Sequence, residues 1–357
     1  MQSPKYAHGG DIFGIARKLG VEPSEIVDLS SNISYQAPEF IRTSLQQHWD
    51  AVHHLPEPYS QSLLQRLSEQ YYFPSSHFIC GAGTTELLQW LGYCYASKNV
   101  LIVQPTYSDY ERCTSCYGCT INYLILEESN EFGFNIEAFC QLAAAVQVVF
   151  LCNPNNPTGI LLEKDVITDL VERFPDTLFV VDESYMPFVE TQVSFSLVGM
   201  AFPNLVVLRS MSKIFAVSGL RIGWLFSSNL VLNEKIRSLM SPWSVNSLAQ
   251  LIAEKLICAD ASDLVHYIQK IKAKFIEQLL VMQEFRPFPG QANFVLIKSS
   301  KYTAHEMYDT FAQQKMLIRD CSNFVGLNQS FIRISVKEEH SMRMAASVFK
   351  QLESKGG

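Results

Sequence analysis

The fold is decided at VVFLCNPNNPTG, residues 148–159, where a fully apolar run passes directly into polar residues. The same arrangement recurs in LFVVDESY at residues 178–185 and in LVVLRSMSK at residues 205–213. Apolar runs without alternation are typical of parallel strands that helices cover on both faces. Ligands of such sheets bind beyond the carboxyl ends of the strands. The polar residues that follow the three runs are therefore predicted to meet around one ligand.

These polar residues supply complementary chemical groups. They are the amide of Asn156, the carboxylate of Asp182, the hydroxyls of Ser210 and Ser212, the amine of Lys213 and the guanidinium of Arg221. A cofactor that withdraws electrons through an aldehyde and a ring needs an amine to bind the aldehyde and an acid to keep the ring nitrogen protonated. Lys213 and Asp182 fit these roles, and the set as a whole predicts a site for pyridoxal phosphate.

A glycine-rich turn offers a place for the phosphate of this cofactor. GAGTTELL, residues 81–88, follows a predicted strand at 78–80 and opens a predicted helix at 86–96. Backbone N–H groups of such a turn and of the helix start can bind a dianion, which makes Gly83, Thr84 and Thr85 candidate ligands. Arg221 adds a permanent cation that can bind phosphate through two nitrogens.

The composition favours a soluble enzyme. The chain has 357 residues, 48% of them hydrophobic and 18% charged, which is enough to bury a large core. A net charge of −7, without a basic run, argues against a nucleic-acid surface. We find no apolar run of about 18 residues that could span a membrane, and residues 1–6 lack the apolar region of a secretion signal. A cytoplasmic protein with reduced cysteines is predicted.

Two groups of possible metal ligands are interpreted as structural. Cys113, Cys116 and Cys119 have the spacing of an iron–sulfur motif. They also fall on a predicted helix that Gly118 ends, ahead of a predicted strand at 120–124, and the helical spacing would place Cys113 and Cys116 on one packed face. His53 and His54 are adjacent and would point to different sides, so they are predicted to be solvated. We predict no catalytic metal.

The order of four motifs resembles the class I and II aminotransferase superfamily, the fold type I enzymes that bind pyridoxal phosphate. These motifs are NPNNPTG at residues 153–159, DESY at 182–185, SMSK at 210–213 and GLRIG at 219–223. The resemblance spans nearly the whole chain. It implies an α/β fold with a mostly parallel central sheet and a smaller α/β domain. The implied large cofactor domain comprises residues 45–235, and residues 1–44 and 236–357 form the small one.

The resemblance also implies roles for single residues around the cofactor. Tyr107 would stack on the pyridine ring, and Asn156 and Tyr185 would bind its hydroxyl group. Ser210, Ser212 and Arg221 would complete the phosphate site. Tyr59 would reach the phosphate held by a partner subunit, which implies a homodimer with shared active sites.

Further segments resemble the threonine-phosphate decarboxylases of cobalamin biosynthesis. They are HGGD at residues 8–11, DLSSNI at 28–33, LIRDCSNFVGL at 317–327 and SPWSVN at 241–246. A substrate of that family carries a carboxylate and a phosphate, for which Arg319 and Arg333 would be the cations. His8, Asn32 and Asn156 would add hydrogen-bonding groups. The implied reaction converts O-phospho-L-threonine to (R)-1-amino-2-propanol O-phosphate, and O-phospho-L-serine differs by a single methyl group, which a pocket discriminates weakly.

Two other functions stay open. Histidinol-phosphate aminotransferases share the NPNNPTG and SxSK elements, and the cofactor residues Lys213, Asp182 and Tyr107 would serve either reaction. A non-catalytic regulatory domain that binds pyridoxal phosphate is the alternative of another class. The retained Lys213, and the lack of a basic helix-turn-helix extension in this sequence, argue against that alternative.

Overall fold

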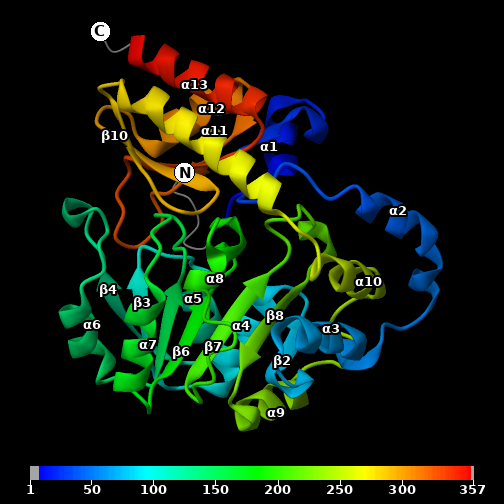
Figure 1. Ribbon diagram of the computed structural model, residues 1–357. Coiled ribbons are helices and arrows are strands. Elements are labelled where there is room, and N and C mark those ends of the chain that lie inside the picture. Colours follow the sequence, from blue (N-terminus) through cyan, green and yellow to red (C-terminus); the bar gives the residue numbers. More distant parts are fainter. Residues whose placement is uncertain (1–7, 355–357) are drawn as a thin grey trace.

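A seven-stranded sheet forms the lower half of the computed structural model, which describes residues 8–354 (Figure 1). Its strand order is β2-β8-β7-β6-β5-β3-β4. The strands are β2 (Phe78–Gly81), β3 (Asn99–Gln104), β4 (Thr120–Ile125), β5 (Val148–Cys152), β6 (Leu178–Asp182), β7 (Leu205–Ser210) and β8 (Gly223–Ser227). Strands β3 to β7 are parallel, and β8 runs antiparallel to both neighbours. The predicted fold class is therefore confirmed.

The three apolar runs are the central strands of this sheet. Every residue of β5, β6 and β7 is buried, as expected for parallel strands covered on both faces. Asp182, at the end of β6, is in register with Cys152 on β5 and with Leu208 on β7. Because the strands are parallel and in register, the polar residues after them meet at one edge of the sheet.

Helices connect the strands of this sheet and cover its faces. They are α3 (Gln61–Tyr71), α4 (Thr84–Cys94), α5 (Asp109–Ser115), α6 (Ile136–Ala143), α7 (Lys164–Arg173), α8 (Gln192–Phe195) and α9 (Leu230–Leu239). Helix α4 begins two residues earlier than the sequence predicts, directly after Gly83. A glycine at this position lets the chain turn sharply from β2 into the helix.

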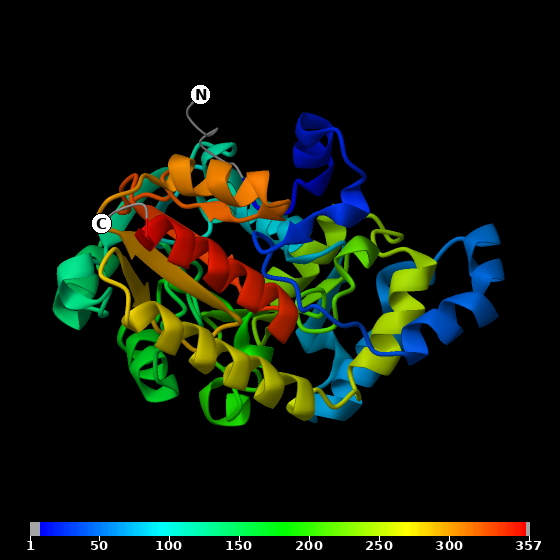
Figure 2. The same cartoon turned by 90° about the horizontal axis from the view of Figure 1, so that it is seen from above.

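A second, four-stranded antiparallel sheet lies above the first. Its order is β12-β13-β10-β9, formed by β12 (Arg319–Asp320), β13 (Phe331–Ser335), β10 (Phe294–Ser299) and β9 (Phe285–Phe288). Its helices are α11 (Ser262–Leu280), α12 (Ala304–Gln313) and α13 (Glu339–Ser354), which lie side by side in the view from above (Figure 2). All residues of β13 are buried, and this strand lies between β12 and β10 in the sheet.

The remaining elements belong to neither of the two main sheets. They are α1 (Ile12–Leu19), α2 (Phe40–Gln47), α10 (Ser247–Leu256), the parallel pair β1 (Val27–Asp28) and β11 (Met316–Leu317), and seven short 3₁₀ turns at Pro23–Glu25, Trp49–His53, Pro58–Ser60, Ser75–His77, Glu128–Asn130, Met186–Phe188 and Ser218–Leu220. One hydrophobic cluster includes residues of both main sheets. The division at residues 45 and 235 stays a prediction.

The cysteine prediction is partly wrong. Cys113 is buried as expected, but Cys116 is exposed because α5 already ends at Ser115. His53 and His54 are both exposed. Within residues 8–354, no helix is long and apolar enough to cross a membrane. The prediction that no secretion signal is present concerns residues 1–6, which lie outside the described residues.

Candidate active site

Lys213 lies in the loop that follows β7, close to the end of β6. Its Nζ is 5.9 Å from the ring centroid of Tyr185. Burial, the largest cause, lowers the pKa of Lys213 to about 8. The charge of Asp182 opposes the shift, while the positive charges of Arg333 and Arg221 add to it. A larger neutral fraction near neutral pH makes this amine a better nucleophile than an ordinary lysine.

Asp182 is held by two hydrogen bonds, one to each carboxylate oxygen. The hydroxyl of Tyr110 donates to Oδ2 at 2.8 Å, and the backbone N–H of Ser184 donates to Oδ1 at 2.9 Å. Both bonds fix the plane of the carboxylate and leave lone pairs for a protonated ring nitrogen. Sequence reasoning missed Tyr110. Its spacing from Tyr107, three residues along a helix start, is the signal that could have revealed it.

The predicted phosphate cradle combines the start of α4 with the loop that contains Arg221. Gly83 has a φ of +80°, and a Cβ atom there would lie 2.7 Å from a terminal nitrogen of Arg221. A Cβ on Gly223 would lie 2.8 Å from the backbone nitrogen of Thr84. Two glycines therefore allow a guanidinium and the N–H groups of Thr84 and Thr85 to converge, which is the arrangement that a phosphate dianion requires.

Two serines support this cradle from the Lys213 loop. The Ser210 hydroxyl accepts a hydrogen bond from the backbone N–H of Ser212 at 3.3 Å, and the Ser212 hydroxyl donates to the carbonyl of Ile222 at 3.2 Å. Since Ile222 follows Arg221 directly, the second bond ties the lysine loop to the arginine loop. The amine and the phosphate cradle are thus fixed relative to each other.

The segment of residues 28–34 and strand β13 form the opposite wall. The backbone N–H of Ser34 donates to the carbonyl of Lys213 at 2.8 Å. Asn32 is buried, and its Nδ2 donates to the hydroxyl of Tyr185 at 3.0 Å. Arg333 donates from Nη1 to Oδ1 of Asn156 and from Nη2 to the carbonyl of Ser30 at 2.6 Å. These bonds bring the predicted substrate residues to the cofactor residues.

Arg333 and Arg319 lie opposite each other on paired strands. Arg319 donates to Oδ1 of Asn323 at 2.6 Å, and its guanidinium lies 5.0 Å from the ring centroid of Phe324. Burial, the largest cause, lowers the pKa of Arg319, and the charge of Arg333 contributes. Nε of Arg333 is buried and has no hydrogen-bond partner among residues 8–354. Two neighbouring buried cations with an unsatisfied donor are suited to an anionic ligand.

Tyr107 and His8 lie together at the side of the site. The Tyr107 hydroxyl donates to Oδ2 of Asp109 at 2.8 Å, and its ring packs edge to face on Tyr110. The His8 ring centroid lies 5.4 Å from that of Tyr107. Tyr59 does not lie with these residues. It lines a small separate pocket together with Arg237, and the other residues of that pocket are not predicted site residues.

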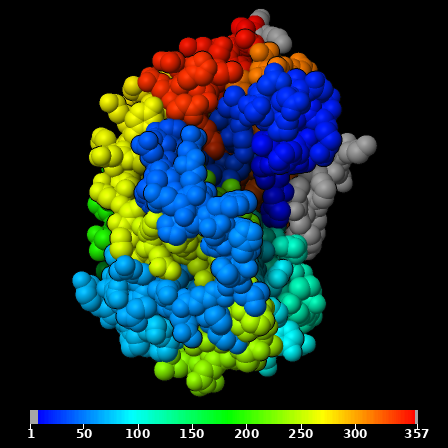
Figure 3. Space-filling model, turned by 90° about the vertical axis from the view of Figure 1, so that its right-hand side faces the viewer, coloured from blue at the N-terminus to red at the C-terminus, as the bar shows by residue number. Residues whose placement is uncertain are grey.

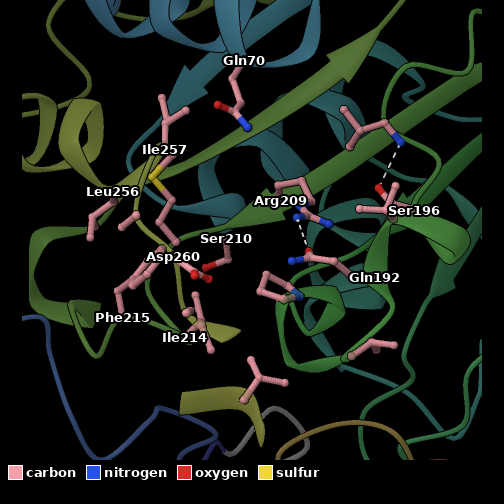
Figure 4. Close-up of a pocket in the computed structure, with 18 of the residues that line it drawn as sticks. Gln70, Gln192, Ser196, Arg209, Ser210, Ile214, Phe215, Leu256, Ile257 and Asp260 are labelled. Carbon is pink, nitrogen blue, oxygen red and sulfur yellow. Dashed lines mark hydrogen bonds between the residues drawn. The ribbon is translucent and has the colours of Figure 1, made fainter. Parts of the chain in front are cut away.

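A cavity of about 760 Å³ lies beside the lysine loop (Figure 4). Ser210, Ile214 and Phe215 line it, together with Arg209, which donates to Glu183 at 3.0 Å and to Gln192 at 3.1 Å. Lys213 and Asp182 are not among its lining residues. Of these three predicted cofactor residues, only Ser210 lines this cavity.

The residues of the site fit pyridoxal phosphate. A lysine of lowered pKa can bind the aldehyde, Asp182 can pair with the ring nitrogen, and the start of α4 with Arg221 can hold the phosphate. Sequence reasoning missed Asp109 and Tyr110. They hold predicted site residues in place, but neither belongs to one of the motifs from which the site was predicted.

Comparison with known proteins agrees with this fit. The profile described as "Aminotransferase class I and II" matches residues 24–349. The adenosylcobalamin biosynthesis bifunctional protein CobDQ of Leptospira interrogans is 30% identical over 97% of this chain, which spans only 41% of that longer protein. Threonine-phosphate decarboxylase of Salmonella typhimurium is 28% identical, over 93% of this chain and 92% of that protein.

A solved structure points to a second activity in the same group. Histidinol-phosphate aminotransferase of Clostridium acetobutylicum is 25% identical and superposes with a TM-score of 0.87, covering 92% of this chain and 100% of that one. Both activities are thus found among similar proteins. Since the profile covers most of the chain and the site fits the cofactor, the chain belongs to the class I and II aminotransferases, a family of enzymes that depend on pyridoxal phosphate.

Proposed function

We propose that the protein decarboxylates O-phospho-L-threonine to (R)-1-amino-2-propanol O-phosphate, the reaction that would supply the cobalamin nucleotide loop. O-phospho-L-serine, which would give ethanolamine phosphate, is the variant substrate smaller by one methyl group. The observation that carries this proposal is the pair of buried arginines, Arg319 and Arg333, on adjacent strands beside the lysine site. Two cations suit a small ligand with two anionic groups, and a phosphoamino acid has a carboxylate and a phosphate.

Each residue has a definable part in this reaction. When bound, the cofactor supplies a protonated ring that accepts electrons from the bonds of the substrate α-carbon. Asp182 keeps the ring nitrogen protonated. Arg333 and Arg319 would hold the two anions of the substrate, and this placement would decide which bond of the α-carbon breaks. Once the carboxylate has left, Nζ of Lys213 delivers a proton to the α-carbon.

Histidinol-phosphate aminotransferase is the second candidate, favoured by the close structural match of the Clostridium enzyme. In that reaction Nζ of Lys213 removes the proton from the α-carbon, so the cofactor residues are the same. The two candidates differ only in how the arginine pair places the substrate. A non-catalytic regulatory role is the third candidate, and it predicts that none of these substrates reacts.

The three candidates are separated by one set of incubations. Purified protein loaded with cofactor is mixed with phosphothreonine, with phosphoserine, or with histidinol phosphate and 2-oxoglutarate. We expect carbon dioxide from a phosphoamino acid and no glutamate from the third mixture. Glutamate without carbon dioxide would establish the aminotransferase instead. The variant Lys213→Ala, which lacks the amine, is the matched control and should be inactive in every mixture.

A further inference from the structure

Asp109 is contacted by three side chains, those of its near neighbours Tyr107 and Arg112 and that of the distant His8. It begins α5, and its side chain is only 3% exposed. Tyr107 donates to Oδ2 at 2.8 Å, and Nε of Arg112 donates to Oδ1 at 2.8 Å. Nε2 of His8 lies 3.2 Å from the same Oδ1. Burial alone would raise the pKa of Asp109, but the hydrogen bonds from His8, Arg112 and Tyr107 outweigh it and hold that pKa well below its ordinary value.

The His8 imidazole is therefore fixed on two sides. Its Nε2 faces the Asp109 carboxylate, and its ring lies against that of Tyr107, with 5.4 Å between the centroids and 43° between the planes. Its side chain remains 42% exposed, so a ligand can reach it. With Nε2 engaged by Asp109, Nδ1 is the nitrogen that can face such a ligand.

The two glycines after His8 let the chain pack closely against Ser30. A Cβ on Gly9 would lie 2.4 Å from the carbonyl oxygen of Ser30, and the N–H of Gly10 donates to the Ser30 hydroxyl at 2.7 Å. The Ser30 carbonyl also accepts from Arg333. The backbone after His8 thus packs closely against Ser30, which also binds Arg333. A side chain at position 9 would prevent this close packing.

We propose that Asp109 is a positioning residue that locks His8 over Tyr107, so that the imidazole is held beside the wall where Arg333 meets Ser30 and can reach an anionic group of the substrate. This inference rests on the proposed function, because it takes the substrate to be a phosphorylated amino acid. Asp109 itself touches neither substrate nor cofactor. It acts through His8, and its bond to the Tyr107 hydroxyl keeps the ring beneath His8 in place.

The test uses holoenzyme and the variants Asp109→Asn, His8→Ala and the double variant. The asparagine keeps an oxygen for the Tyr107 hydroxyl but removes the charge that holds His8. We expect each single variant to raise the KM for phosphothreonine or phosphoserine about tenfold with kcat within about threefold of wild type. The double variant should be no worse than the single ones, because both changes remove one interaction. The absorbance of bound cofactor should stay unchanged.

Asp165→Asn is the matched control, since Asp165 is also in the first turn of a helix but is exposed. If the wild type reacts with a phosphoamino acid and Asp109→Asn leaves its KM unchanged, the role of Asp109 is refuted while the proposed function stands. Single-variant effects that multiply fully in the double variant would refute that role as well. Wild type that neither binds nor converts a phosphoamino acid would overturn the proposed function, and this inference with it.

Discussion

The pKa of Lys213 is set by the groups around it and not by the residues next to it in the sequence. Burial lowers its pKa to about 8, and the neighbouring arginines contribute, while Asp182 limits the shift. A serine before a lysine is common in solvated loops, where the pKa would stay near 10.5. The environment that activates the amine is assembled by strands and loops distant in sequence.

This shift predicts a pH dependence for cofactor binding to the apoprotein. Only the neutral amine attacks the aldehyde, so the rate of covalent capture should rise with pH and level off, with a midpoint near 8. Stopped-flow absorbance of the bound cofactor measures this rate. Asp182→Asn removes the charge that opposes the shift and should move the midpoint lower. A midpoint near 10 in wild type would contradict the environment described for Lys213.

Tyr110 offers a second test at the same scale. Tyr110→Phe removes one of the two donors to the Asp182 carboxylate, and a hydrogen bond to a charged group is worth about 2 kcal/mol. We expect the affinity for pyridoxal phosphate to fall about tenfold or more, as measured by equilibrium titration.

The control for Tyr110 changes the ligand instead of the protein. A cofactor analogue with carbon in place of the ring nitrogen does not pair with Asp182. Its affinity should therefore be the same in wild type and in Tyr110→Phe. Equal losses with both ligands would mean that Tyr110 merely supports the fold.

At the level of elements, the turn from β2 into α4 depends on Gly83, which allows a positive φ and a close approach of Arg221. Gly83 has a positive φ and faces the Arg221 guanidinium, so a side chain there would displace the guanidinium that is predicted to bind the phosphate. Gly83, which caps the start of α4, has no side chain to satisfy the first N–H groups of the helix, which leaves them to an anion.

Gly83→Ala is therefore predicted to weaken cofactor binding at least tenfold and to lower the free energy of unfolding by about 1–2 kcal/mol. Dialysis against cofactor and denaturant unfolding of the apoprotein measure the two effects. Gly219→Ala is the matched control, because it lies two residues before Arg221 and a Cβ there would meet nothing within 4 Å. Similar losses in both variants would show that the close approach at Gly83 is irrelevant.

At the scale of the whole molecule, the segments that follow α2 and precede α10 carry several exposed aromatic and aliphatic side chains. Trp49, Leu55, Tyr59 and Trp243 are between 43% and 73% exposed. Figure 3 shows the segment from α2 towards α3 running across one face of the molecule. A concentration of large apolar side chains at the surface is typical of a contact with another protein. It supports the predicted homodimer, in which Tyr59 would serve the site of the partner subunit.

Mixed dimers test this arrangement. Tyr59→Phe should weaken cofactor binding about tenfold, and Lys213→Ala should abolish covalent binding. If each site combines Lys213 of one subunit with Tyr59 of the other, dimers that contain one chain of each variant hold one intact site. Cofactor titration of the mixed species should then show recovery of wild-type affinity at that site. Weak cofactor binding in the mixture would mean that Tyr59 does not serve the site of the partner subunit.

Much of this fold and site could be predicted because its signals are local. The apolar runs before Asn153, Asp182 and Arg209 specify buried parallel strands, and the residues after them must share one edge. The exposure of Cys116 was predicted wrongly, because the end of α5 depends on where the chain turns towards β4. A helical spacing does not tell where the helix stops.

The sequence by itself determined the parallel sheet and the cofactor class, and it predicted the lysine, the acid and the phosphate ligands, since each signal is a short motif of residues close together in the chain. Only the tertiary structure decided which residues hold these groups in place. Arg333 meets Asn156 across 177 positions, and Tyr110 meets Asp182 across 72. The physical reason is that such contacts depend on the packing of whole elements, which the local pattern of residues does not specify.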